Sequence, residues 1–127
     1  VDSLGFDEVN NKLLFIEFKD TSYKSCKNNS VQSGRESFLI NRLVVSLLGD
    51  ENMNSISKKF ILVLGKSKNS VPLASYYAAK QSNSLIENHM YKHLNDTLIN
   101  YDYFGNKLFD EIEIVSEDHF DDVVKNI

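Results

Sequence analysis

The sequence contains few of the residues that mark disulfide-bonded or membrane-spanning proteins. Its single cysteine, Cys26, cannot close an intramolecular disulfide, so the fold does not depend on an oxidising compartment. Its longest apolar stretch, Leu43 to Leu48, includes Ser46, and no stretch approaches the roughly 20 apolar residues of a membrane span. Glycine-rich phosphate loops, cysteine pairs and serine nucleophile elbows are also absent from the sequence. We therefore expect no membrane partner and a cytoplasmic location, with a secreted effector domain as the alternative.

The residues that are present describe one globular domain. The chain has 127 residues and a mass of 14.5 kDa, of which 42% are hydrophobic and 25% charged. This composition suits a single domain over residues 1–127 with one real core. The sequence opens at Val1 with strand-like residues, from which we expect a processed or excised domain.

Charge is distributed unevenly along the chain. The net charge of −4 combines −3 over residues 1–11, +6 over residues 12–80 and −7 over residues 81–127. A basic middle and an acidic C-terminal third could present a polyanion-binding face on one side of the domain. Solvated charge on loops is the alternative explanation.

Hydrophobic periodicity predicts alternating strands and helices. Residues 13–18 are apolar at both parities except Glu17, which indicates an interior strand of an α/β sheet with one acid that needs explaining. A helix between this strand and the next favours parallel pairing of the two. The predicted elements are strands over 1–6 and 12–18, a helix over about 35–48, a strand over 59–65, helices over 73–81 (opened by Pro72) and about 84–99 (capped by Ser84), a strand over 111–115 and a helix from Ser116 to about 125.

The first two strands form a predicted hairpin that brings three charged residues together. With Asn10 and Asn11 as a two-residue turn, Asp2 lies opposite Lys19. Asp2 and Glu17 are then diagonal neighbours on one face, about 7–8 Å apart. A turn one residue longer would move Asp2 to the other face.

Two neighbouring carboxylates and a lysine have the composition of a phosphodiesterase site. A divalent cation, Mg²⁺ or Mn²⁺, removes the repulsion between Asp2 and Glu17. The cation would lower the pKa of a bound water and offset charge on a phosphate oxygen, while Lys19 orients the water or steadies the anion. The alternative is that Glu17 and Lys19 are solvated on a wet strand face.

The segments VDSLGF and LLFIEFKD resemble the PD-(D/E)XK nuclease superfamily, with Asp2, Glu17 and Lys19 at the motif positions. The resemblance covers residues 1 to about 65 by element order. It implies a restriction-endonuclease-like fold, in three α/β/α layers with a mixed central sheet. No proline precedes Asp2, and the helix and first strand that usually precede it are absent from this sequence. Truncation, a partner protein or second copy of the chain that supplies them, or a wrong assignment to the superfamily would account for this difference.

Other residues could contact nucleic acid or metal. Arg35 and Arg42 share one side of the predicted helix, and the remaining candidates for phosphate contacts are Lys24, Lys27 and Gln32. Ordinary surface positions are an equal alternative for these residues. Lysines 58, 59, 66 and 68 extend the basic sector. His89 and His93 have the i, i+4 spacing of metal ligands, but the segment lacks the glutamate of a zinc-protease helix.

These features predict a metal-dependent endonuclease that acts on DNA in first place and RNA in second. The residues expected to be catalytic are Asp2, Glu17 and Lys19, and the metal ligands are Asp2 and Glu17. Restriction, repair, mobile-element processing and a tRNA-cleaving toxin domain all remain open as roles. The alternative class is a non-catalytic interaction or immunity-like module whose acidic C-terminal third binds a basic partner.

Overall fold

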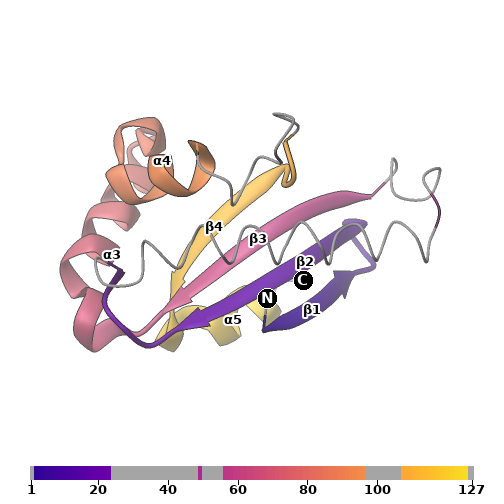
Figure 1. The fold of residues 1–127 in the computed structure, drawn as a ribbon, viewed down its shortest axis with the longest axis horizontal. Coiled ribbons are helices and arrows are strands. Elements are labelled where there is room, and N and C mark those ends of the chain that lie inside the picture. The colour runs from indigo at the N-terminus through magenta and orange to yellow at the C-terminus, as the bar shows by residue number, and fades with distance from the viewer. Residues whose placement is uncertain (1, 24–48, 50–55, 97–106, 126–127) are drawn as a thin grey trace.

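The computed structural model describes residues 2–23, 49, 56–96 and 107–125 (Figure 1). The described residues form an α/β structure with a four-stranded mixed sheet and three α-helices. The strands are β1 (Ser3–Asp7), β2 (Lys12–Lys19), β3 (Ser57–Leu64) and β4 (Glu111–Ser116). The α-helices are α3 (Lys66–Gln81), α4 (His89–Asp96) and α5 (Phe120–Lys125), with short 3₁₀ helices η1 (Leu85–Glu87) and η2 (Glu117–His119).

The sheet has the strand order β1-β2-β3-β4. β1 pairs with β2 antiparallel, and β2–β3 and β3–β4 are both parallel. The predicted hairpin, the parallel pairing of the second and third strands and the late strand are therefore confirmed. The carboxyl ends of β2, β3 and β4 lie at one edge of the sheet, next to the start of α3 (Figure 1).

The predicted two-residue turn of the hairpin is wrong. Asp7 is paired with Lys12, so four residues form the loop, and Asn11 alone has a positive φ, of 53°. Asp7 favours the longer loop because its carboxylate accepts hydrogen bonds from the backbone N–H of Val9 and Asn10 and from the Asn10 side chain. These bonds lower the pKa of Asp7, chiefly through the Asn10 side chain. The register shifts by two residues, and a shift of two keeps every side chain on its expected face.

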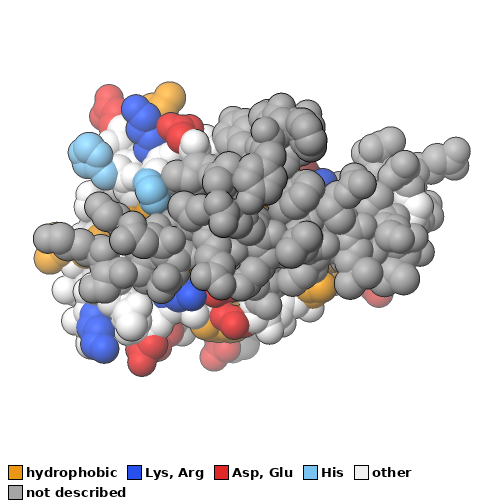
Figure 2. All heavy atoms as spheres, viewed as in Figure 1, with side chains coloured by type: hydrophobic (Ala, Val, Ile, Leu, Met, Phe, Trp, Pro, Cys, Tyr) orange, Lys and Arg blue, Asp and Glu red, His pale blue; other side chains and the backbone are white. Residues whose placement is uncertain are grey.

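Apolar residues are buried on both faces of the sheet, as interior strands require. On one face Phe15 of β2 and Leu62 of β3 pack against residues of α3 and α4, among them Leu73 and Leu94. Figure 2, drawn from the same side as Figure 1, shows histidine side chains at the end of the molecule where α3 and α4 lie. The other face carries a smaller cluster packed against α5, made of Leu14, Ile16, Ile61, Val63 and Val115 with Phe120 and Val123.

Helix α3 begins earlier than the sequence predicts. It starts at Lys66, whereas Pro72 was expected to open it. Asn69 has non-helical dihedral angles (φ −130°, ψ 21°), so the regular part of the helix starts anew after it. Pro72 falls in the first turn of that part, where its missing N–H removes no helical hydrogen bond.

The segment after α3 also differs from its prediction. Ser84 makes no side-chain cap and is followed by the short helix η1. Asn88 caps α4 instead, because its Oδ1 accepts a hydrogen bond from the Tyr91 N–H at 2.9 Å. The final predicted helix is present as η2 followed by α5. The predicted helix over 35–48 lies outside the described residues.

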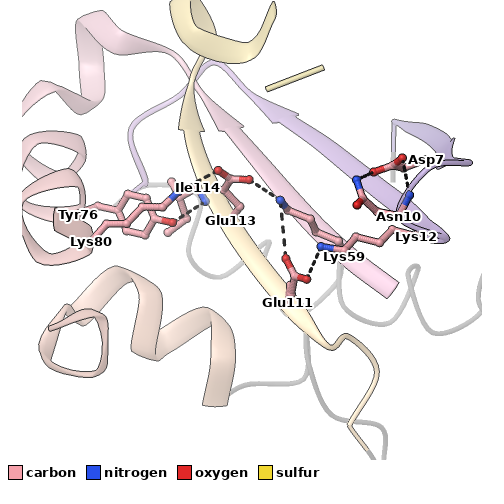
Figure 3. A network of polar contacts seen from close by, with 9 residues as sticks. All are labelled: Asp7, Asn10, Lys12, Lys59, Tyr76, Lys80, Glu111, Glu113 and Ile114. Carbon is pink, nitrogen blue, oxygen red and sulfur yellow. Dashed lines mark hydrogen bonds and ion pairs between the residues drawn. The ribbon is translucent and has the colours of Figure 1, made fainter. Parts of the chain in front are cut away.

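A chain of ion pairs crosses the α5 face of the sheet near the amino ends of β2 and β3 (Figure 3). Lys12 Nζ lies 2.6 Å from Glu111 Oε1, and Lys59 Nζ lies 2.7 Å from Glu113 Oε2. Lys80 of α3 reaches the second oxygen of Glu113 at 3.0 Å. Basic residues of the middle segment are thus neutralised by acids of β4, which accounts for part of the charge asymmetry along the chain.

Glu113 is the centre of this network. Burial opposes ionisation of Glu113, but the hydrogen bonds from Lys59 and Lys80 outweigh it and hold the pKa of Glu113 below its usual value. The same contact raises the pKa of Lys80 against the opposing effect of its own burial. Glu113 therefore stabilises the fold while it is ionised, above the pKa of about 4.3 that it has when unfolded.

We predict that Glu113→Gln lowers the free energy of unfolding by roughly 1–3 kcal/mol at pH 7, because two charge-assisted hydrogen bonds are lost. The difference from wild type should shrink as pH falls through the lowered pKa of Glu113, since the carboxyl group is then protonated in both states. Urea unfolding at pH 7 and near pH 3.5 measures both quantities. The exposed Glu117→Gln serves as the matched control, and an equal difference at both pH values would contradict the prediction.

Candidate active site

Glu17 and Lys19 lie together at the carboxyl end of β2. Glu17 is only 5% exposed, and its Oε1 lies 3.1 Å from Lys19 Nζ. Both residues share the parity of Phe15, so they belong to the sheet face that α3 and α4 cover. Phe18, between them, points to the other face and packs edge-on against Phe120 of α5, with ring centroids 5.2 Å apart. This contact anchors the strand end that carries the two charged residues.

Asp2 lies across from these residues on the neighbouring strand. Since Ser3 pairs with Ile16, the same register places Asp2 opposite Glu17 and not diagonal to it. Asp2 was predicted to face Lys19, but the structure places it opposite Glu17, two residues earlier on β2. Asp2 and Glu17 remain on the same face of the sheet, as predicted. Asp2 is exposed, and its Oδ2 accepts a hydrogen bond from the Phe18 N–H at 2.7 Å.

Burial of Glu17 is energetically expensive. Its neighbour across the parallel pairing is Leu62, itself 4% exposed. Removing a carboxylate from water costs several kcal/mol unless a charge partner offsets it, and Lys19 supplies that partner. The acid that interrupts the apolar strand is therefore not a solvated surface residue, which removes that alternative for Glu17.

Asn69 is a residue of this region that sequence reasoning missed. Its side chain is fully buried, and its Oδ1 accepts a hydrogen bond from the Tyr23 N–H at 2.6 Å. Its Nδ2 donates to the carbonyl oxygens of Thr21, at 3.1 Å, and Gly65, at 2.8 Å. Asn69 thus ties the segment that follows Lys19 to the start of α3. In the sequence, Asn69 is marked only by its position, as a polar residue three positions before Pro72.

Gly65 permits a close approach at the same junction. Its N–H donates to the Lys19 carbonyl at 3.0 Å, and a Cβ at this position would lie 2.9 Å from Asp20 Oδ1. The carboxyl ends of β2 and β3 therefore meet tightly beside Lys19.

Most of the other candidate residues are outside the part of the chain that the structure describes. Lys24, Lys27, Gln32, Arg35 and Arg42 lie outside the described residues. Lysine 59 is on the opposite sheet face, paired with glutamate, and so is not available beside Glu17.

Candidate metal ligands are few in the described part of the chain. His89 and His93 line one pocket together with Glu87. Within the described ranges, no group of three or more histidine, cysteine or acidic residues could hold a metal ion. Asp2 and Glu17 supply carboxylate oxygens, the ligand type that Mg²⁺ takes, usually one or two at a time with waters completing the shell.

No protein-family model, curated protein or solved structure matches this chain. Among the helices in the described residues, none is both long and apolar enough to cross a membrane.

We predict that Asn69→Ala lowers the free energy of unfolding by about 1–3 kcal/mol, because three backbone groups, one of them in a fully buried hydrogen bond, lose their partner. Amide hydrogen exchange of the Tyr23 N–H should accelerate with it, as the segment after β2 is released. Gln81→Ala, on the exposed end of the same helix, is the control and should change stability by less than about 0.5 kcal/mol. An Asn69→Ala protein as stable as this control would show that the three bonds do not hold the junction.

Proposed function

We propose that the protein is a metal-dependent endonuclease related to the PD-(D/E)XK nucleases, with a three-layer α/β/α core like that of restriction endonucleases. The observation that supports this best is the buried Glu17 beside Lys19, with Asp2 at the facing position of the neighbouring strand. β3 lies parallel to the strand that carries Glu17, as expected for the strand that follows the hairpin and a helix in that superfamily; the predicted helix between them lies outside the described residues.

The three side chains have distinct roles in the proposal. Glu17 and Asp2 would hold Mg²⁺ or Mn²⁺, which supplies an acidified water and charge neutralisation for phosphodiester hydrolysis when bound. Lys19 lies beside Glu17 and can donate hydrogen bonds to a phosphate oxygen or to the attacking water. Phe18, through its contact with Phe120, fixes the direction in which its two charged neighbours project.

Asp2 also has a structural role, which depends on a hydrogen bond to β2. Because its Oδ2 accepts from the Phe18 N–H, the carboxylate is held against the strand that carries Glu17. Asp2 therefore positions the hairpin as well as offering an oxygen ligand. DNA is the first substrate class and RNA the second, tRNA included.

We predict that the purified protein cuts plasmid DNA or bulk RNA with Mg²⁺ or Mn²⁺ but not with EDTA. Glu17→Gln should reduce the rate by at least about 10²-fold, since a neutral amide with a single oxygen replaces the carboxylate that would hold the cation. Lys19→Met should reduce it by about 10²–10³-fold, the usual effect of removing one charge-stabilising donor. Gel-based initial rates measure each effect.

Two variants control for charge alone. Glu117→Gln and Lys107→Met alter exposed residues of the same types outside the site and should leave the rate within twofold of wild type. Folded protein that cuts neither substrate with either metal would overturn the nuclease proposal and favour a non-catalytic interaction module. Cutting that survives in both site variants would place the activity elsewhere.

A further inference from the structure

We propose that the pocket between Tyr23, α3 and α4 binds an unpaired nucleobase of the substrate, within two nucleotides of the scissile phosphate. The proposal rests on the proposed nuclease function and names the part of the substrate that the site recognises. The pocket has a volume of about 560 Å³, and its walls include Tyr23, Val71, Pro72, Asn88, Met90 and His93.

The pocket and the candidate active site belong to the same side of the sheet. Tyr23 packs against the apolar cluster that contains Phe15, on the face that carries Glu17 and Lys19. Tyr23 lies four positions after Lys19 in the chain, so their Cα atoms are at most roughly 14 Å apart. The Asn69 hydrogen bond to the Tyr23 N–H fixes this short connection. A strand with a phosphate at Lys19 can therefore reach the pocket with a nearby nucleotide.

The walls suit a flat aromatic ligand. The rings of Tyr23 and His93 meet edge to face, with centroids 6.1 Å apart and an interplanar angle of 79°. Val71, Pro72 and Met90 add apolar surface, and Val71 is 78% exposed at the rim. Nucleobases are bound in this way by stacking on aromatic side chains beside apolar contacts.

Asn88 supplies a polar group in the pocket wall. It is 7% exposed, and its Oδ1 is used to cap α4 by accepting from the Tyr91 N–H. Its Nδ2 makes no hydrogen bond to another described residue, so it can donate to a ring nitrogen or carbonyl oxygen on a base edge. Such edge recognition requires an unpaired base, because pairing occupies the same edge.

Charge favours a base over a phosphate in this pocket. Glu87 lines it beside His89 and His93, and no lysine or arginine is among its described walls. A phosphate would face the Glu87 carboxylate, whereas a neutral base would not. The anionic part of the substrate belongs at Lys19.

The test combines abasic substrates with a pocket variant. Single-stranded oligonucleotides of one sequence, each with one abasic site, are cleaved under the conditions of the intact strand. We expect kcat/KM to fall roughly 5- to 150-fold when the abasic site lies within two nucleotides of the cut, the effect of one lost base–aromatic stack. His93→Ala should cause a similar loss on the intact strand and no further loss on that abasic strand.

Matched controls separate the pocket from general damage. His119→Ala removes a histidine on the α5 side, and Ile86→Ala removes an exposed apolar residue that does not line the pocket. Both should leave kcat/KM within twofold. Equal cleavage of all abasic strands, or additive losses from His93→Ala and the abasic site, would overturn the pocket while the nuclease proposal stands.

Base binding is also measurable without cleavage. A single-stranded oligonucleotide that contains 2-aminopurine should lose fluorescence when the protein is added, and His93→Ala should weaken the quenching by the same factor. Quenching of this kind from a protein that cuts nothing would support the pocket and overturn only the nuclease proposal. Absence of quenching at protein concentrations up to 0.1 mM, a limit of roughly 5.5 kcal/mol in affinity, would overturn the pocket.

Discussion

Burial of the Glu17 carboxylate in the interior strand β2 determines which residues must surround it. β2 is covered on both faces, so its side chains must be apolar or must compensate for the loss of water. Glu17 is compensated by Lys19 two residues later, on the same face, while Phe18 fixes the strand from the opposite side. An apolar pair at these positions would pack at least as well, because buried ion pairs are often no more stable than hydrophobic replacements. The Glu17–Lys19 pair lies at the carboxyl ends of the parallel strands, and ligands usually bind at this end of the strands in open α/β sheets.

The two sheet faces carry different sets of charged residues. On the α5 face, lysines of β2, β3 and α3 are paired with Glu111 and Glu113 of β4. On the other face, Glu17 and Lys19 share the side of β2 that carries Phe15, and Tyr23, a wall of the pocket with aromatic residues, packs against the same apolar cluster. The basic middle and acidic C-terminal third of the sequence therefore neutralise each other in part within the fold, and a charge sum over segments does not identify a binding face.

The sequence was sufficient for the hairpin, the parallel third strand and the late fourth strand. Apolar residues at both parities leave few alternatives to interior strands for β2 and β3, and the alternation of acidic and apolar residues after Glu111 indicates the fourth strand. It could not give the hairpin loop, where side-chain hydrogen bonds of Asp7 outweigh the turn preference of two asparagines. The predicted start of α3 at Pro72 is wrong, because α3 begins at Lys66. Pro72 does lie in a first helical turn, but that turn follows the kink at Asn69 within the longer helix. The face shared by Asp2 and Glu17 was predictable, since it depends only on parity. The role of Asn69 was not, because two of its three partners, backbone groups of Thr21 and Tyr23, are distant in sequence.

Isothermal titration calorimetry with Mn²⁺ most directly tests the claim that Asp2 and Glu17 form a cation site. The proposal requires one site per chain that depends on the carboxylates of Asp2 and Glu17. We expect Asp2→Asn and Glu17→Gln each to weaken Mn²⁺ binding by 10-fold or more, with Glu117→Gln unchanged, in proteins that remain folded. Binding of equal strength in all four proteins, or no binding to the folded wild type, would contradict it.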